Sequence, residues 1–260
     1  MPLRSKIIAR GVGKAYQSRQ GMLLALRDFD LEVGEGEFVC LIGPSGCGKS
    51  TFLRILAGLY EKSAGEITVH KSSADKPRNS MVFQEYAIFP WRTVLDNVAF
   101  GLKMRGLSRR DRYEIADRYI RKVGLAKFRG SYPYQLSGGM KQRVSIARAF
   151  ANDPEVLLMD EPFGALDAQT RVVLQEELLR IWEEDKKTVV YVTHSIEEAI
   201  MLGDRVAVMT AHPGTNKEEF KVGFPRPRSL HIKGAAEFAE LSLRIWECLE
   251  QEVKRAMEST

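Results

Sequence analysis

Residues 43–50 carry the sequence GPSGCGKS, whose spacing G-x-x-x-x-G-K-S suits one kind of chemistry. The apolar run Phe38–Ile42 precedes this segment, and apolar residues with helical spacing follow it, so the glycines join a strand to a helix. Glycines leave backbone N–H groups free to close around phosphate oxygens, and the positive end of the helix faces the same charge. The pattern predicts a phosphate-binding loop rather than a turn that binds nothing.

Side chains at the end of this loop have separate expected roles. Lys49 should neutralise the β- and γ-phosphates, Ser50 should place its hydroxyl on Mg²⁺, and Thr51 should contact the α-phosphate. The residues predicted to bind nucleotide here are Gly43, Pro44, Ser45, Gly46, Cys47, Gly48, Lys49, Ser50 and Thr51.

Two carboxylates, Asp160 and Glu161, follow the apolar residues 156–159. A buried strand would place them at a sheet edge, where a metal nucleotide can sit. Mg²⁺ bound mainly by phosphates needs one or two carboxylates, which suits Asp160, and Glu161 is then free to orient and deprotonate water. Loop and carboxylates together predict a nucleotide hydrolase or a kinase, without separating transport motors from GTPases or small-molecule kinases.

The surrounding pattern predicts the elements that hold these residues. Strands are expected near 24–33, 37–42 and 81–83, followed by helical stretches at 93–104, 108–123 and 138–151. Further strands at 156–159, 189–193 and 206–209 alternate with helices around 174–182 and 196–202. This β/α alternation predicts a parallel sheet covered by helices, with the middle block as a helical insert.

Residues 135–143 read QLSGGMKQR, and over about its first 210 residues the chain resembles the ATP-binding cassette family, whose signature is LSGG before a helix. Ser137, Gly138 and Gly139 open a helix whose N–H groups and dipole can accept an anion. Met140 stands where the family most often has glutamine.

The resemblance implies roles for further residues. Tyr16 resembles the aromatic residue that stacks on adenine, and Gln84 resembles the glutamine that senses Mg²⁺ and the lytic water while touching membrane subunits. Asp167 in GALD resembles the loop that communicates between two nucleotide sites, and His194 the histidine that contacts the γ-phosphate. The implied catalytic residues are Glu161, His194, Gln84 and Lys49, and the implied ligands of Mg²⁺ are Ser50, Gln84 and Asp160.

The resemblance also implies an α/β fold: a P-loop NTPase core with a mixed, mainly parallel sheet, an antiparallel N-terminal β part, an inserted α-helical subdomain and a C-terminal helix. We expect residues 1–90 to form the N-terminal part of the nucleotide-binding core with its β subdomain, and residues 91–151 to form the helical signature subdomain. Residues 152–215 should form the C-terminal part of the core, and residues 216–260 a C-terminal turn and amphipathic helix. It further implies a head-to-tail homodimer that sandwiches two ATP molecules.

Three stretches resemble the importer ATPases of the nitrate, sulfonate and taurine group: EYAIFPWRTVLDNVAFGL after Gln84, TAHPG at 210–214 and FPRPR at 224–228. The chain departs from the group at HKSSADKPRN (70–79), which lacks a glycine-proline pair, and at Ser195. The implied partners are membrane permease subunits and, indirectly, a periplasmic or extracellular solute-binding protein. The implied location is peripheral, on the cytoplasmic face of the inner membrane.

Composition and charge exclude several other classes of protein. Apolar runs are at most five residues long and a bilayer needs about 20, so no membrane span is expected, and no secretory signal is evident. Three cysteines without metal spacing predict neither a disulfide framework nor a zinc site. The net charge of +5 comes from interleaved acids and bases, which argues against nucleic-acid binding.

The tail, residues 235–257, has the apolar spacing of an amphipathic helix that packs on its own domain. Its apolar face comprises Phe238, Leu241, Ile245, Leu249, Val253 and Ala256. Two other functions stay open at this point: a soluble cassette ATPase that acts on nucleic acid or ribosomes, and an inactive structural subunit.

Overall fold

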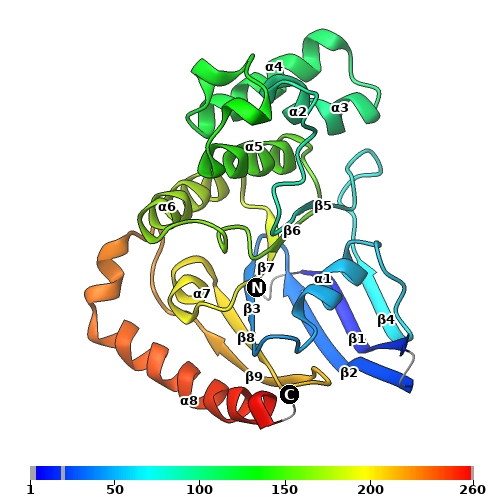
Figure 1. Cartoon of the computed structure of the whole chain (residues 1–260), viewed down its shortest axis with the longest axis vertical. Helices are drawn as coiled ribbons and strands as arrows, with labels where there is room; N and C mark the ends of the chain where they lie inside the picture. The colour runs from blue at the N-terminus through cyan, green and yellow to red at the C-terminus, as the bar shows by residue number, and fades with distance from the viewer. Residues whose placement is uncertain (1–3, 19–20, 259–260) are drawn as a thin grey trace. The chain divides into compact units, whose positions relative to one another are not determined.

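The computed structural model describes residues 4–18 and 21–258, which fall into two compact units (Figure 1). Unit 1 comprises Met1–Lys71 and Lys186–Thr260, and unit 2 comprises Ser72–Asp185. Unit 1 is therefore built from two separate segments of the chain, and unit 2 is formed by one continuous segment.

The main sheet of unit 1 has the strand order β7-β3-β8-β9. The central strand β3 (Phe38–Ile42) pairs in parallel with β7 (Thr188–Val192) and β8 (Arg205–Met209), and β9 (Asn216–Lys221) is antiparallel to β8. Every residue of β3 and β7 is buried, as expected for parallel strands covered on both faces by helices.

A second, antiparallel sheet of unit 1 has the order β2-β1-β4. It consists of β1 (Ser5–Ser18), β2 (Gly21–Gly34) and β4 (Ala64–Val69), and β1 pairs with both neighbours. This sheet is the antiparallel N-terminal part that the resemblance implied.

Helices of unit 1 follow the strands of its main sheet. Helix α1 (Lys49–Leu56) follows β3, α7 (Ile196–Leu202) follows β7, and a 3-10 turn at Leu230–Gly234 leads into α8 (Ala236–Glu258). In Figure 1, α1 and α7 lie on opposite sides of β3. The apolar face of α1 is buried, whereas Leu59, three residues beyond the end of the helix, is 55% exposed.

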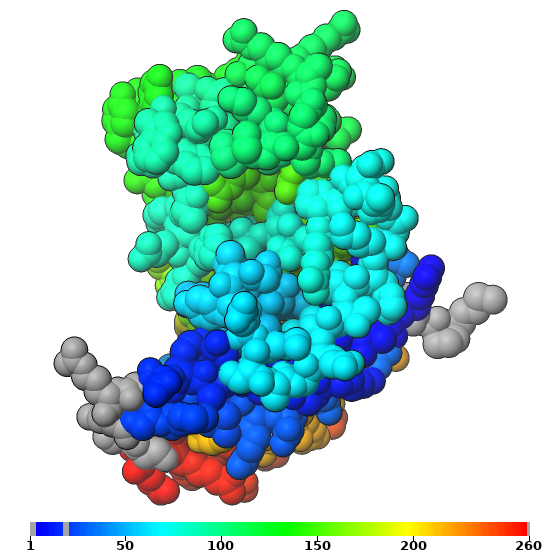
Figure 2. Space-filling view, turned by 90° about the vertical axis from the view of Figure 1, so that its right-hand side faces the viewer, coloured from blue at the N-terminus to red at the C-terminus, as the bar shows by residue number. Residues whose placement is uncertain are grey.

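Unit 2 combines a parallel strand pair with a set of helices. Strand β5 (Asn79–Val82) runs parallel to β6 (Val156–Asp160), and in chain order the helices α2 to α5 lie between them. Figure 1 shows α5 between α6 on one side and α2 and α4 on the other, and Figure 2 shows α3 to α5, in green, as one compact mass. The helical elements are α2 (Val94–Val98), α3 (Phe100–Met104), α4 (Arg109–Lys122), α5 (Gly138–Ala151), α6 (Ala168–Asp185), and 3-10 turns at Ala126–Phe128 and Pro133–Gln135.

The predicted fold class is confirmed: the parallel strands, the antiparallel N-terminal sheet, the helical insert and the C-terminal helix are all present. One predicted helix, at 93–104, is instead two short helices, α2 and α3, which meet at Ala99. Within residues 4–18 and 21–258, no helix combines the length and the apolar character needed to cross a membrane.

Candidate functional site

The predicted site residues divide between the two units. Unit 1 holds Tyr16, the loop 43–51 and His194, and unit 2 holds the others. Those of unit 2 are Gln84, Ser137, Gly138, Gly139, Asp160, Glu161 and Asp167.

The loop 43–51 leads from β3 into α1, and its glycines are needed for different reasons. Gly46 has φ +77° with open space where a Cβ would lie, so backbone alone lines that part of the loop. Gly48, at φ +102°, caps α1, and a Cβ there would lie 2.7 Å from Leu26 Cδ2. A Cβ on Gly43 would lie 2.8 Å from Cys47 Sγ. Left-handed backbone and close packing therefore both require glycine in this loop.

Lys49 folds back over the loop that precedes it. The side chain is 5% exposed, and its ammonium donates hydrogen bonds to the carbonyl oxygens of Gly43 at 2.7 Å and Pro44 at 2.8 Å. A buried cation within a glycine-lined turn at a helix N-terminus matches the charge and shape of a phosphate group. The observed backbone therefore fits the triphosphate group predicted from the sequence.

His194 lies at the same sheet edge as this loop. Strands β3 and β7 are parallel neighbours, with Leu41 opposite Val192, and the N–H of Thr193 donates to Leu41 O at 3.2 Å. Their carboxyl ends therefore coincide, which places the exposed His194 beside the start of the loop.

The start of α7 fixes the backbone around His194. The Thr193 hydroxyl donates to the Glu198 carboxylate and accepts from the N–H of Ser195 at 3.0 Å. The Ser195 hydroxyl in turn accepts from the N–H of Glu198 at 3.3 Å, which caps the helix. Ser195, where the chain departs from the importer group, thus retains a capping function.

Tyr16 lies on β1 and is half-buried. The Tyr60 ring meets it edge-on, with the two ring centroids 6.4 Å apart, and the Lys14 ammonium lies 5.0 Å from its centroid. These two contacts restrict the orientation of an aromatic ring that could stack on a base.

Strands β5 and β6 bring three predicted residues of unit 2 to one edge. Val82 pairs with Met159, so the exposed Gln84, Asp160 as the last residue of β6, and Glu161 all lie at the carboxyl ends of parallel neighbours. Asp160 is 2% exposed, and Glu161, half-buried, has φ +43°. A left-handed glutamate is uncommon, and such backbone occurs where a turn must aim a functional side chain.

The described residues contain no group of three or more histidine, cysteine, aspartate or glutamate side chains arranged to hold a metal ion. A cation at this edge would take most of its ligands from phosphates and water, which is how Mg²⁺ binds in nucleotide sites. Single oxygen donors at Gln84 and Asp160 fit that coordination.

The signature residues form the N-terminus of α5. Ser137 is exposed and caps the helix, because its hydroxyl accepts from the N–H of Met140 at 3.3 Å. A Cβ on Gly138 would lie 2.6 Å from the Tyr86 hydroxyl, and one on Gly139 would lie 3.0 Å from Thr170 Cγ2. Both glycines therefore permit close approach by neighbouring segments of unit 2.

Asp167 caps the N-terminus of α6. Its exposed carboxylate accepts from the N–H of Thr170 at 2.9 Å, and this hydrogen bond lowers the pKa of Asp167 below its ordinary value. The carboxylate therefore stays ionised beside the first turn of α6.

Sequence reasoning missed the attachment of the segment after Gln84 to the signature helix. The Ser145 hydroxyl donates to the carbonyl of Tyr86, and the Arg148 guanidinium donates to the carbonyl of Ala87 at 2.9 Å. Burial lowers the pKa of Arg148 from its ordinary value. Polar residues on an otherwise buried helix face were the available signal, but the sequence does not identify their partners.

The same segment borders a groove of 790 Å³ within unit 2. Asn97, fully buried, fixes the segment 89–93, which contains the lining residue Pro90: the side-chain amide donates to the carbonyls of Phe89, Arg92 and Thr93 and accepts from the N–H of Phe89 at 2.7 Å. Trp91, in the segment that Asn97 holds, is 71% exposed. The groove is lined by Gln84, Glu85, Tyr86, Ala87, Ile88, Pro90, Pro133, Lys141 and Ala165.

Comparison with known proteins agrees with this geometry. The family model for ABC transporters matches residues 26–164, more than half of the chain. An uncharacterized ABC transporter ATP-binding protein of Methanocaldococcus jannaschii is 48% identical over 98% of this chain and 95% of its own length. The chain therefore belongs to the ABC transporter family.

Within that family, two named relatives are import proteins. The nitrate import ATP-binding protein NrtD of Synechocystis is 43% identical over 89% of this chain and 90% of its own length. The taurine import ATP-binding protein TauB of Rhizobium johnstonii is 45% identical over 87% of this chain and 89% of its own length.

Solved structures show the same fold. A dimeric bacterial ABC transporter cassette is similar at a TM-score of 0.74 and 36% identity, covering 84% of this chain and all of that chain. The same cassette in a post-hydrolysis state, bound to ADP and Pi, gives the same TM-score at 35% identity. The chain is an ATPase of this family.

Proposed function

We propose that this protein is the ATP-hydrolysing subunit of an importer that takes up a small solute of the nitrate, sulfonate or taurine kind through separate membrane subunits. The observation that carries the proposal is the pairing, in one chain, of a phosphate loop covered by buried Lys49 with the exposed serine-capped terminus of α5. The relatives whose names specify nitrate and taurine import support the choice of solute class.

In the proposed reaction, ATP is the substrate and the loop grips its phosphates. Backbone N–H groups of residues 43–50 and the Lys49 ammonium stabilise the charge that develops as the γ-phosphate leaves. Glu161 takes the proton of the attacking water, and His194 and Gln84 hold that water in line. Mg²⁺, held by Ser50, Asp160 and Gln84, would neutralise the β- and γ-phosphate oxygens. Tyr16 stacks on the adenine.

Two copies complete each site in this proposal. The α5 terminus of one copy, with Ser137, Gly138 and Gly139, covers the triphosphate held by the loop of the other, and Asp167 lies between the two sites. An exposed helix terminus carries a partial positive charge that favours a γ-phosphate. The dimeric structure of a related cassette supports this arrangement.

Membrane permease subunits dock, we propose, on the groove of unit 2 beside Trp91. An exposed tryptophan next to a groove lined by both apolar and charged residues suits a protein partner, and Gln84 in that lining would sense the docked subunit. The protein would therefore work at the cytoplasmic face of the inner membrane, and a solute-binding protein would act on it indirectly, through the permease. The alternative of a cassette acting on nucleic acid or ribosomes is not favoured by the import relatives.

Purification of the tagged full chain from detergent-solubilised membranes of its own host tests this assignment. We expect integral membrane subunits to copurify, Trp91→Ala to lose them, and the ATPase activity of the free chain to be unchanged. Trp246→Ala is the matched control, because Trp246 is also exposed, at 46%, but lies on α8. Copurification of ribosomes or nucleic acid in place of membrane subunits would support the alternative.

A further inference from the structure

Gly214 lies directly against the phosphate-binding loop, in a turn far from it in sequence. A Cβ on Gly214 would lie 1.9 Å from the carbonyl oxygen of Cys47 and 2.9 Å from Met209 Cε. Its φ lies outside the left-handed region, so the position requires glycine for space and not for backbone conformation. The turn and the loop are therefore in contact through backbone atoms alone.

Strand β2 contacts both the turn 210–215 and the phosphate-binding loop. The N–H of Gly214 donates to Ala25 O at 3.1 Å, and the N–H of Arg27 donates to Gly214 O at 3.0 Å. A Cβ on Gly48 would lie 2.8 Å from the same Ala25 oxygen and 2.7 Å from Leu26 Cδ2. Three backbone segments thus meet at one point, and displacement of one must displace another.

The turn is closed internally by Thr210. The N–H of Thr215 donates to the Thr210 hydroxyl at 3.0 Å, and the N–H of Thr210 donates to the carbonyl of Thr215 at 3.0 Å. These two hydrogen bonds make residues 210–215 a rigid turn, so a displacement of one side of the turn also displaces the other side.

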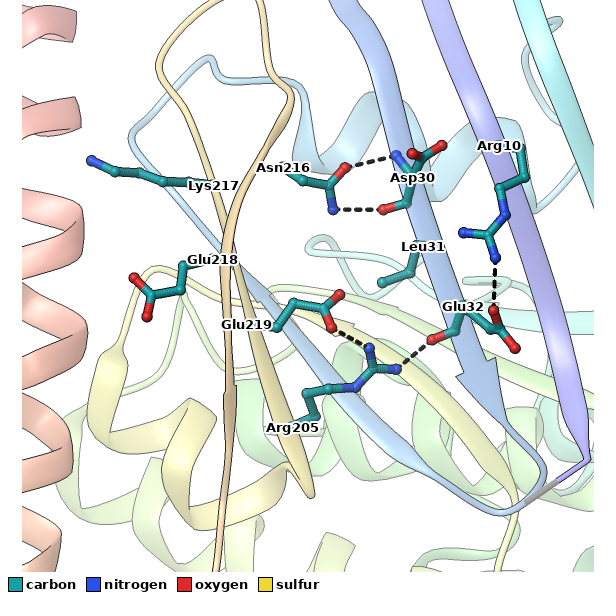
Figure 3. Close-up of a pocket in the computed structure, with 9 residues that line it drawn as sticks. All are labelled: Arg10, Asp30, Leu31, Glu32, Arg205, Asn216, Lys217, Glu218 and Glu219. Atoms are coloured by element: carbon teal, nitrogen blue, oxygen red, sulfur yellow. Dashed lines mark hydrogen bonds and ion pairs between the residues drawn. The ribbon is translucent and has the colours of Figure 1, made fainter. Parts of the chain in front are cut away.

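Helix α8 holds the other side of this turn through Glu252. The carboxylate, 1% exposed, accepts hydrogen bonds from the N–H of Ala211 at 2.8 Å, from the Lys217 ammonium at 2.8 Å and from Arg255 at 3.1 Å. In Figure 3, Asn216 faces Asp30 of β2 while Lys217 points the opposite way, toward α8. Figure 2 shows the segment around β9, in yellow-orange, between the blue of β2 and the red of α8.

We infer that Gly214 and Glu252 are positioning residues for ATP binding: α8, through the Glu252 carboxylate and the turn 210–215, sets the position of the phosphate-binding loop. The amides that grip a phosphate must be held within a fraction of an ångström, and the support for that accuracy lies in the packing behind the loop. The C-terminal helix α8 therefore helps to position the phosphate-binding loop in addition to packing on the core.

Gly214→Ala in the full chain tests the contact. We expect the Kd for Mg-ATP to rise by about tenfold or more, because a shift of about 1 Å at Cys47 misplaces the loop amides. Gly223→Ala is the matched control, since Gly223 is exposed and a Cβ there would have no other atom within 4 Å, and it should bind ATP as wild type does.

Thiol labelling supplies a readout that overall destabilisation would not reproduce. Burial raises the pKa of both Cys47 and Cys40, so both thiols should react slowly in the wild type. In Gly214→Ala the labelling rate of Cys47, followed by mass spectrometry, should rise several-fold relative to that of Cys40. Wild-type ATP affinity with an unchanged Cys47 rate would overturn the inference, and so would equal increases at both thiols.

Glu252→Gln tests the part assigned to α8, with Glu250→Gln as control because Glu250 is paired with Lys254 on the surface of the same helix. We expect Glu252→Gln to raise the Kd by about threefold and to increase Cys47 labelling, while the control matches wild type. Wild-type affinity and labelling in Glu252→Gln would overturn the role of α8.

Discussion

Arg228, in the FPRPR segment, provides the sharpest test of how the C-terminal tail stabilises unit 1. Its guanidinium, with a side chain 2% exposed, closes the carboxyl end of α7, the helix that begins just after His194. It donates to the carbonyls of Phe224 at 3.1 Å, Ile200 at 3.1 Å, Met201 at 3.4 Å and Gly203 at 2.6 Å, and lies 3.8 Å from Asp204. Replacement with methionine keeps the volume and removes every one of these donors.

The expected cost follows from these contacts. One hydrogen bond to a charged group contributes about 1.5–3 kcal/mol, but bonds from a single side chain do not add. Removal of one member of a buried charged network typically costs about 3–5 kcal/mol, and we expect Arg228→Met to fall in that range. At roughly 2–4 °C per kcal/mol for a chain of this size, Tm should fall by about 10 °C.

Thermal unfolding followed by circular dichroism measures this loss, with Arg10→Met as the control. Arg10 is 57% exposed and paired with Glu32, so its loss should cost no more than about 1 kcal/mol. Arg228→Lys keeps the charge but not the planar fork and should lie between the two. A Tm for Arg228→Met equal to that of the control would refute the role of Arg228 in holding the end of α7.

Three further outcomes are expected. Lys49→Ala should raise the Kd for Mg-ATP by about a hundredfold in calorimetry, because the loop loses its buried cation; near-native affinity would contradict the phosphate role. Tyr16→Ala should lose about 1–3 kcal/mol of ATP affinity and Tyr16→Phe little, whereas equal losses for tripolyphosphate, which has no base, would exclude stacking. Burial raises the pKa of Glu252, but hydrogen bonds from Lys217 and the Ala211 N–H outweigh it and lower the pKa below the ordinary 4.5. The contribution of Glu252 to the free energy of unfolding is therefore present above pH 4.5 and is lost as the pH falls through the lowered pKa of the folded state. In Glu252→Gln, the free energy of unfolding should therefore fall less steeply with decreasing pH below 4.5 than it does in the wild type. An equally steep fall would contradict this role.

The sequence was most informative where neighbouring residues determine the structure. Strand β3, the glycine loop and the start of α1 are one continuous segment, and the observed boundaries follow the apolar run, the left-handed Gly48 and the buried face of the helix. The serine-glycine start of α5 was predictable for the same reason, because a cap depends on residues three positions apart.

The sequence was least informative where distant residues meet. Glu252 was assigned to no face of the predicted tail helix, yet it is buried because Ala211 and Lys217 supply its partners. The sequence identified Gly214 only as part of the TAHPG stretch, because its contact with Cys47 depends on the packing of three segments that are remote in sequence. Helix periodicity also could not show the break at Ala99.

The central claim is that two copies of this chain close on ATP, each copy covering the other's triphosphate. Glu161→Gln tests it most directly, because the variant keeps the loop and the signature helix but lacks the proposed base. In size-exclusion chromatography with light scattering, we predict a monomer without nucleotide and a stable dimer with Mg-ATP, which Ser137→Arg in the same background abolishes. A Glu161→Gln chain that binds Mg-ATP and remains monomeric would contradict the account.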